Sequence, residues 1–272
     1  EHFGVSRDVG QIAPGRFADI LLVGDLEEID VQMVIAKGEV VVEEGKMLVD
    51  LPSFNYPEEV KNSVNLGKKL TAGDFKIEVS TEGEITANVI GIVENQAPTK
   101  HLKLPVTVVE GEIPIDIERD LLKVALVERH KGTGEVQVAL VQGFGLDKGC
   151  ALGSTVAHDS HQMIVVGSDE DAMALAANRL AEIRGGQVVI KDGEVLAEVE
   201  LPIAGLMSNE RAEVVAEKAE VLLEAFRECG CTLNNANMQL SLLALVVIPD
   251  LRISDKGLDD VNAFEVVSIQ AE

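Results

Sequence analysis

The sequence predicts an α+β fold, with mostly antiparallel sheets, a few packed helices and a small β-meander at the N-terminus. Three observations support this prediction. Short apolar or alternating segments, separated by turn residues, recur throughout the chain of 272 residues. Two longer segments have helical periodicity instead. Helices and hairpins do not follow strict strand–helix–strand order, which argues against a doubly wound parallel sheet.

Residues 1–50 are predicted to contain the β-meander. The pair Pro14-Gly15 favours a type II turn and precedes an apolar strand at residues 20–23. A second strand, residues 31–36, turns at Lys37-Gly38 into a third. A sheet of a few short strands is not stable alone, and the apolar residues of these strands therefore need a partner sheet.

Residues 51–70 are interpreted as an irregular linker, and we expect one α+β domain over residues 71–272. Three short strands are predicted at residues 75–79, 85–93 and 102–109. The turns between them favour antiparallel pairing. Residues 116–123 are compatible with one or two helical turns. The turn at residues 131–134 lies between the apolar residues 124–127 and an alternating strand from Val136, which predicts a hairpin.

Two helices are predicted in the second half of the chain. The first begins at the capping sequence Ser168-Asp169 and ends at Gly185-Gly186. The second begins at Ser208. Their apolar residues recur on one helical face: Ala172, Ala176, Leu180 and Ile183 in the first, and Val215, Ala219, Leu222 and Phe226 in the second. Between the helices, Asp192-Gly193 suits a type I′ turn and predicts another hairpin. A last apolar run over residues 240–248 ends at Pro249.

The composition excludes several classes of partner. Forty-seven acidic residues against 23 basic ones give a net charge of −24, which repels nucleic-acid phosphates and anionic membrane surfaces. No apolar run approaches the roughly 18 residues of a spanning helix. Three cysteines cannot all pair, so we interpret them as free thiols in a soluble, cytoplasmic protein. Because the chain begins at Glu1 rather than at methionine, we expect a fragment whose missing part lies upstream.

The densest cluster of chemically active side chains is His158-Asp159-Ser160-His161, which precedes an apolar strand. Two imidazoles and a carboxylate can exchange protons, orient one another or bind a metal ion. In a strand the two histidines would face opposite ways, whereas a turn would place both on one side. A polar turn with no function beyond structure is the alternative, because the motif lacks remote ligands that would complete a metal site.

A second candidate is Glu128-Arg129-His130, which follows an apolar strand and precedes a glycine-containing turn. The alternative interpretation is an exposed strand end. Gly143-Phe144-Gly145 does not fit a dinucleotide fingerprint, and the sequence contains no P-loop, serine nucleophile elbow or catalytic cysteine context.

The N-terminal segment resembles part of a known superfamily. Residues 10–20, with the hairpin through Lys37-Gly38-Glu39-Val40, resemble the end of the composite β-sandwich that metal-dependent amidohydrolases carry after their catalytic barrel. The resemblance implies that residues 1–50 are the C-terminal part of that sandwich.

The rest of the chain resembles, in order, the C-terminal domain of bacterial-type adenine deaminase. The matching segments are residues 128–134, 143–146, 154–161, 202–208, 247–249 and 255–258. The resemblance implies that the intact enzyme hydrolyses adenine to hypoxanthine and ammonia with a metal-activated water in an amidohydrolase barrel, where the divalent metal is manganese or iron.

The chain contains no counterpart of the barrel's metal ligands. Its five histidines are His2, His101, His130, His158 and His161, and none forms a His-x-His pair. We therefore expect no catalytic residue and no bound metal or other cofactor in this chain, whose principal partner would be its own catalytic barrel. Under the resemblance, the pocket candidates contact adenine: Glu128, Arg129, His130, His158, Asp159, Ser160 and His161.

Two further hypotheses stay open at this point. The same region would be a structural or oligomerisation module that does not contact substrate, and a homo-oligomer is compatible with either interpretation. Alternatively, the chain itself would bind a metal ion through His158, Asp159 and His161. The metal identity, the exact substrate and the oligomeric state do not follow from the sequence.

Overall fold

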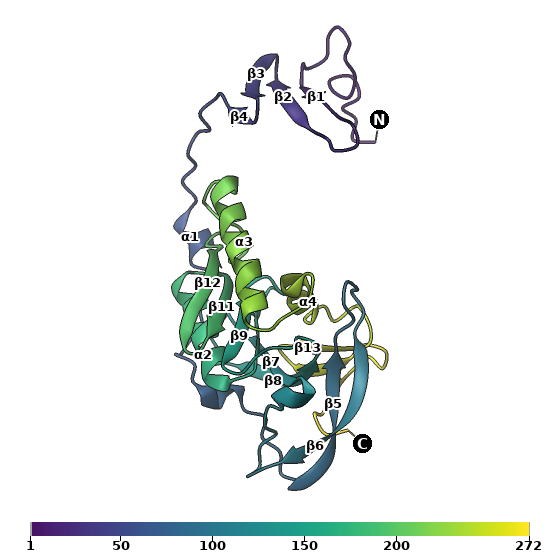
Figure 1. Ribbon diagram of the computed structural model, residues 1–272, viewed down its shortest axis with the longest axis vertical. Coiled ribbons are helices and arrows are strands. Elements are labelled where there is room, and N and C mark those ends of the chain that lie inside the picture. The colour runs from purple at the N-terminus through teal and green to yellow at the C-terminus, as the bar shows by residue number, and fades with distance from the viewer. Residues whose placement is uncertain (1, 272) are drawn as a thin grey trace. The chain divides into compact units, whose positions relative to one another are not determined.

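The computed structural model describes residues 2–271, which form two compact units, with the boundary along the chain between Asn55 and Tyr56 (Figure 1). Among the described residues, no helix combines the length and the apolar character that crossing a bilayer requires. The three cysteines are buried and unpaired, as predicted.

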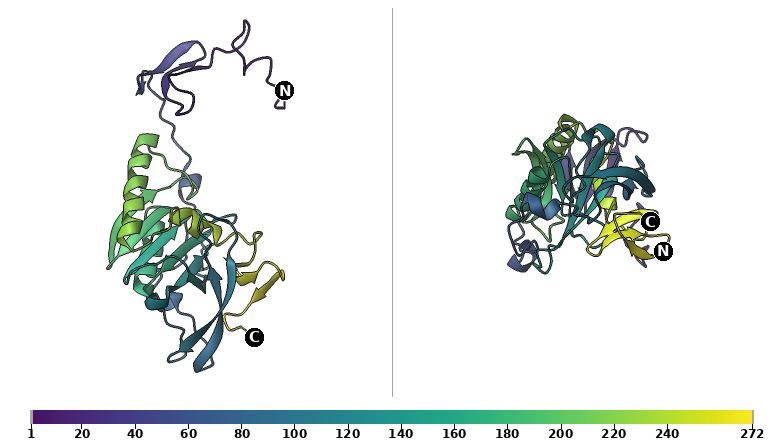
Figure 2. Two further views of the ribbon diagram at one scale, coloured as in Figure 1. Left: turned by 45° about the vertical axis from the view of Figure 1, so that its right-hand side comes forward. Right: turned by 90° about the horizontal axis from the view of Figure 1, so that it is seen from below.

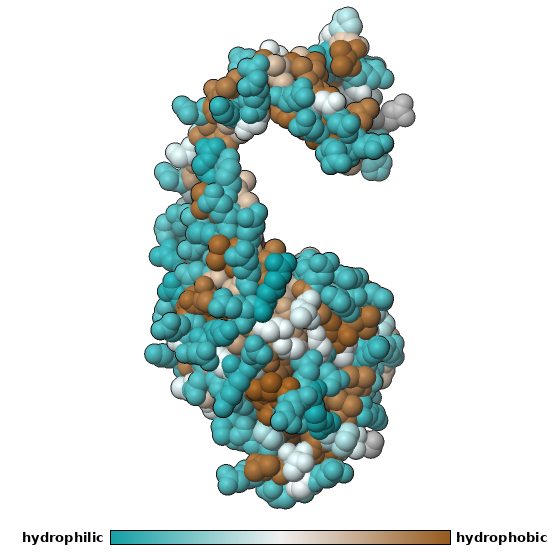
Figure 3. Space-filling view, in the orientation of Figure 1, coloured by the Kyte–Doolittle hydropathy of each residue, from teal (hydrophilic) through white to brown (hydrophobic). Residues whose placement is uncertain are grey.

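The first unit contains the predicted β-meander, a four-stranded antiparallel sheet in the order β1-β2-β3-β4. The strands are β1 (Ile20–Val23), β2 (Val31–Ala36), β3 (Glu39–Glu43) and β4 (Lys46–Met47). The turn between β2 and β3 has a positive φ at both Lys37 and Gly38. Within residues 2–55 no residue is fully buried, and apolar residues such as Leu21 and Phe17 are exposed. Figure 3 shows hydrophobic residues at the surface of this unit. The unit therefore has no hydrophobic core of its own.

The second unit is organised around an eight-stranded sheet in the order β12-β11-β9-β10-β7-β8-β5-β6. All neighbouring strands are antiparallel except β5 and β8. The strands are β5 (Gly83–Gly91), β6 (Lys100–Val108), β7 (Leu121–Val127), β8 (Val136–Gln142), β9 (Cys150–Ser154), β10 (Met163–Gly167), β11 (Gly186–Lys191) and β12 (Glu194–Glu200). The predicted α+β class with mostly antiparallel sheets is confirmed.

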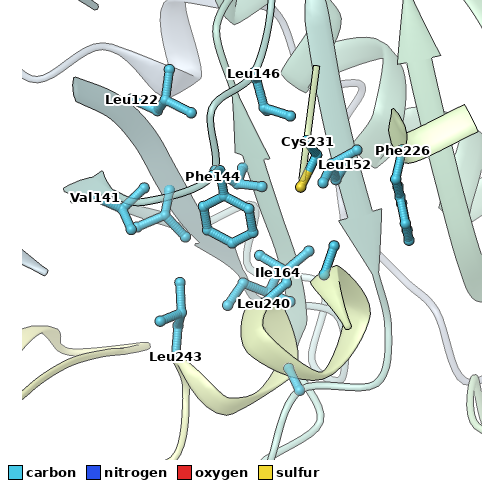
Figure 4. Packing of buried hydrophobic residues seen from close by; sticks show 14 of the residues in the cluster. Leu122, Val141, Phe144, Leu146, Leu152, Ile164, Phe226, Cys231, Leu240 and Leu243 are labelled. Atoms are coloured by element: carbon cyan, nitrogen blue, oxygen red, sulfur yellow. The ribbon is translucent and has the colours of Figure 1, made fainter. Parts of the chain in front are cut away.

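Helices cover both faces of this sheet (Figure 2). Helix α2 (Glu170–Glu182) packs on one face, and α3 (Ala212–Glu228) and α4 (Ala236–Leu242) pack on the other. A three-stranded sheet of β13 (Leu251–Ser254), β14 (Gly257–Asp260) and β15 (Glu265–Val267) lies on the same side as α3 and α4. Figure 4 shows the core on that side, where Phe144 and Ile164 pack near Leu240 of α4.

Burial on both faces explains why the central strands are predominantly apolar; Lys123 of β7, which is buried and ion-paired with Glu112 and Glu170, is an exception. Along β7, Leu122, Val124 and Leu126 belong to the core beneath α3 and α4, whereas Ala125 and Val127 belong to the core beneath α2. All seven residues of β7 are buried. Side chains that alternate between two buried faces leave no polar face in the sequence.

Side chains cap the N-termini of α2 and α4, whereas α3 begins without a side-chain cap. Asp169, rather than Ser168, caps α2, because its carboxylate accepts from the backbone N–H of Ala172. Helix α3 begins at Ala212, four residues after the predicted start at Ser208. The apolar run from Leu240 lies at the end of α4, which Asn235 caps.

The segment at residues 75–79 is not the predicted strand. Residues Ala72–Phe75 form a 3₁₀ helix, because Thr71 and Asp74 make a capping box around its first turn. Only a single bridge, between Glu78 and Glu112, follows. At residues 116–123 the helical part is limited to a 3₁₀ turn, Ile117–Arg119, before β7 begins.

The range interpreted as a linker, residues 51–70, includes packed structure at its C-terminal end. A short helix α1 (Glu58–Lys61) is followed by Leu66 and Leu70, which are buried in the core beneath α2. The backbone N–H of Asn65 also donates to the carbonyl of Arg129 at 2.8 Å. This end of the range therefore belongs to the second unit.

Candidate functional site

The two candidate motifs lie side by side because β7 and β10 are antiparallel neighbours. Val127 at the end of β7 pairs with Met163 at the start of β10. Continuing this register beyond both strands places residues 128–130 next to residues 160–162. The side chain of Gln162 confirms the proximity, because its Oε1 accepts from the backbone N–H of Arg129 at 3.0 Å. Sequence spacing alone did not indicate that the motifs would meet.

Residues His158–His161 form a turn that places both imidazoles on one side. The backbone N–H of His161 donates to the carbonyl of Ala157 at 2.6 Å, and His161 has a φ of 48°. The two ring centroids are 5.4 Å apart in an edge-to-face arrangement. The N–H of His158 donates to the carbonyl of Ser241, which ties the turn to α4. The turn geometry considered from the sequence is the one observed.

Arg129 is buried beneath this turn and holds it to two other segments. Its side chain is 1% exposed, and it donates to three carbonyls. Its Nε donates to the carbonyl of His161 at 2.6 Å. Its Nη1 donates to the carbonyl of Ser63 at 3.0 Å, and its Nη2 donates to the carbonyl of Ala204 at 3.1 Å. Burial lowers the pKa of Arg129 to about 10, while the nearby charge of Glu128 acts in the opposite direction. Arg129 is thus a buried structural centre and not an exposed strand end.

Glu128 is buried and organises the neighbouring turn. Its Oε1 accepts from the backbone N–H groups of His130 at 2.6 Å and Lys131 at 2.8 Å, and its Oε2 accepts from that of Thr133 at 3.2 Å. Burial acts to raise the pKa of Glu128, but these backbone hydrogen bonds outweigh burial and hold the pKa below its usual value. The carboxylate is fully engaged by the backbone, so its role in the isolated chain is to shape this turn.

The remaining candidates are more accessible. His130 is exposed, and its Nε2 donates to the carbonyl of Ser160 at 2.9 Å, which connects the two motifs a second time. Asp159 and Ser160 are exposed, whereas His158 and His161 are half-buried. The surface above Arg129 therefore presents three imidazoles, one carboxylate and one hydroxyl. We call the residues His130, His158, Asp159, Ser160 and His161 the histidine cluster.

The electrostatics of the cluster favour a neutral His161. Burial lowers the pKa of its imidazole, and electrostatic interactions with His158 and Arg129 lower it further. A neutral imidazole presents one donor and one acceptor nitrogen, which suits it to hydrogen-bonding an uncharged heterocycle.

The cluster does not assemble into a metal site. Across residues 2–271, no group of three or more His, Cys, Asp or Glu side chains has the arrangement to hold a metal ion. The hypothesis of a metal bound through His158, Asp159 and His161 therefore finds no coordinating group in this part of the chain.

A third segment that the sequence had not connected with the cluster also reaches Arg129. The loop after β12 supplies the carbonyl of Ala204 to Arg129, and that of Gly205 to the buried Oγ1 of Thr155 at 2.6 Å. Gly205 has a φ of 70°, and a Cβ at this position would lie 2.8 Å from Nη1 of Arg129. Ser63 and Gln162 have no distinguishing signal in the sequence, because each acts through its backbone or a neutral polar group. Ala204 lies in the segment 202–208 that carries part of the family resemblance, but its contact with Arg129 uses a backbone carbonyl and was not indicated.

Comparison with known proteins gives the family. The model of the adenine deaminase C-terminal domain matches residues 96–265, which include the histidine cluster, Arg129 and the loop at Ala204. The chain belongs to the adenine deaminase C-terminal domain family. This confirms the resemblance found in the sequence.

Curated relatives from several bacteria extend over nearly the whole chain. Adenine deaminase 3 of Rhizobium meliloti (strain 1021) is 54% identical over 99% of the chain, and the adenine deaminase of Roseobacter denitrificans is 55% identical over 98%. The adenine deaminase of Moorella thermoacetica is 44% identical over 99%. The match covers 45%, 44% and 45% of these relatives, respectively, so the chain spans less than half of their length.

Proposed function

We propose that this adenine deaminase domain acts as part of an enzyme that hydrolyses adenine to hypoxanthine and ammonia, with the histidine cluster forming one side of the substrate pocket. The observation that carries the proposal is convergence. Three segments that are far apart in the sequence, residues 128–130, 158–161 and 202–207, meet around the single buried side chain of Arg129. Such a framework holds several polar side chains in fixed positions at the surface.

The chemistry of the cluster suits adenine. Adenine is uncharged at neutral pH and offers ring nitrogens as acceptors and an exocyclic amine as a donor. A neutral imidazole at His161 and the carboxylate of Asp159 supply the complementary donor and acceptor groups.

The hydrolytic chemistry belongs to the catalytic part of the enzyme. A divalent metal there, manganese or iron, would activate the attacking water. The contribution that we assign to this chain is to bind and orient the substrate through the histidine cluster. The catalytic part and adenine are thus the proposed partners, and the buried thiols fit a cytoplasmic enzyme.

The domain organisation proposed for the chain follows the same division. Residues 1–50 contribute strands to a composite β-sandwich, for which the exposed apolar residues of the meander provide the contact surface. Residues 71–272 form the accessory α+β domain.

Alanine substitutions at His158 and His161 in the full-length enzyme test the proposal. We expect kcat/KM for adenine to fall about 10- to 100-fold, since each lost hydrogen bond to substrate costs about 1 to 1.5 kcal/mol. His101→Ala is a matched control, because His101 is another half-buried histidine, whose Nε2 lies 2.8 Å from Oδ1 of Asn88. Unchanged kinetics together with loss of assembly would refute the pocket role and favour the structural or oligomerisation module.

A further inference from the structure

The two ring nitrogens of His161 have different roles. The backbone N–H of Ala157 donates to Nδ1 at 3.3 Å. A nitrogen that accepts a hydrogen bond carries no proton, so the neutral ring has its proton on Nε2. Among the hydrogen bonds within residues 2–271, none engages this Nε2–H, which leaves it available to a ligand.

The backbone around His161 fixes this arrangement. Its own N–H donates to the carbonyl of Ala157, so Ala157 and His161 are joined by reciprocal hydrogen bonds. Its carbonyl accepts from Nε of Arg129 at 2.6 Å. The ring therefore cannot exchange the roles of its nitrogens without losing the bond from Ala157.

The other histidine that contacts this turn also carries its proton on Nε2, but uses it within the protein. Nε2 of His130 faces the carbonyl of Ser160 at 2.9 Å, and a carbonyl only accepts, so that Nε2–H is already used within the protein. His130 thus supports the turn, and its Nε2–H is not free to bind a ligand. His161 is the member of this pair with a donor to spare.

We propose that His161 is a specificity-determining residue that donates, through Nε2–H, to an acceptor nitrogen of the purine ring. The inference rests on the proposed function. Deamination occurs at C6, so the C6 amine and the adjacent N1 face the catalytic groups. N3 lies on the far side of the ring, and N7 lies on the opposite side of the amine from N1; these two are the acceptors left for His161 to recognise.

Asparagine and glutamine at position 161 separate the two ring nitrogens. In His161→Asn, the side-chain oxygen can still accept from the N–H of Ala157, and asparagine tolerates the φ of 48°. That variant lacks the distant donor. In His161→Gln the longer side chain places an amide N–H near the position of Nε2. We therefore expect the glutamine variant to retain more activity than the asparagine variant.

The test combines neutron diffraction of the full-length enzyme with its kinetics on adenine, 3-deazaadenine and 7-deazaadenine. We expect deuterium on Nε2 of His161, and a loss of about tenfold in kcat/KM for one deaza analogue. His161→Asn should abolish that discrimination, and which analogue is affected identifies N3 or N7.

Two other outcomes overturn the inference, and they are distinguishable. Deuterium on Nδ1 and not on Nε2 would refute the donor assignment but leave the pocket proposal standing. Deuterium on Nε2 with the same discrimination in the wild-type enzyme and in His161→Asn would show that this ring does not contact the purine, which refutes the inference; the pocket proposal would then be refuted only if the alanine variants of His158 and His161 also kept wild-type kinetics.

Discussion

Replacing Arg129 by methionine removes the group that joins three segments beneath the histidine cluster. Methionine has a similar length and no charge, so it fills much of the space but donates no hydrogen bond. The carbonyls of Ser63, His161 and Ala204 are then left buried without this donor.

Two opposing contributions determine how much Arg129→Met lowers the free energy of unfolding. Each buried carbonyl that loses its partner costs about 1 to 3 kcal/mol, which gives roughly 6 kcal/mol for three. Burial of the charge opposes this, since a pKa lowered from 12.5 to about 10 corresponds to a cost on the order of 3 kcal/mol. Methionine removes that cost, so the lost hydrogen bonds outweigh the relief, and we expect a net loss of about 3 kcal/mol in the free energy of unfolding.

Lysine should not rescue the site. Arg129→Lys keeps a charge to be buried but has one compact ammonium group, which cannot reach three carbonyls that a planar guanidinium reaches at once. We expect Arg129→Lys to be at least as destabilising as Arg129→Met.

Hydrogen–deuterium exchange of the full-length protein, measured by mass spectrometry, reports the stability of individual segments. Protection of amides in β7 and β10 should fall roughly 100-fold for a loss of 3 kcal/mol. Arg211→Met is the matched control, because the Arg211 side chain is 57% exposed and, within residues 2–271, bonds Glu213 alone; the loss in the free energy of unfolding should stay within about 0.5 kcal/mol. A change below about threefold in Arg129→Met, or wild-type protection in Arg129→Lys, would refute the reasoning.

Three further predictions concern the same region. Gly205→Ala forces a side chain into a φ of 70° and 2.8 Å from Nη1 of Arg129, and should cost about 1 to 3 kcal/mol by the same exchange measurement; wild-type protection would contradict this. Glu128→Gln weakens the hydrogen bonds to the turn at residues 131–134 and should lower the free energy of unfolding by about 2 kcal/mol. Proteolysis at this turn should become faster, and an unchanged cleavage rate would refute the role of Glu128 in shaping the turn. Because the pKa of His161 is lowered from 6.5, the unfolded chain binds a proton that the folded protein does not, so stability is complete above about pH 6.5 and falls below it. In His161→Gln this part of the pH dependence should disappear from denaturation curves, and identical curves for both proteins would contradict it.

Local sequence signals predicted much of the fold correctly. The hairpin between β11 and β12 follows from Asp192-Gly193, whose φ values of 49° and 81° fit the predicted turn. Helix α2 follows from its apolar period, although its cap is Asp169 and not the predicted Ser168. The strand predicted at residues 75–79 was wrong, because the capping interaction between Thr71 and Asp74 outweighed the apolar alternation of this segment.

The site was predicted in parts but not as a whole. The sequence indicated Glu128-Arg129-His130 and the turn at His158–His161 as separate candidates. Their contact depends on the pairing of Val127 with Met163, which is set by the order and register of the whole sheet. The role of Arg129 was also hidden, because its three partners are backbone carbonyls that any residue carries. Convergence of this kind is visible only in three dimensions.

A crystal structure of the full-length enzyme with bound hypoxanthine would test the central claim most directly. The measured quantity is the distance from Nε2 of His161 to the nearest purine nitrogen. We predict a hydrogen bond of about 2.7 to 3.2 Å, with Arg129 still bonded to the carbonyl of His161. A purine bound with the His158–His161 turn beyond hydrogen-bonding reach, directly or through one water, would contradict the claim.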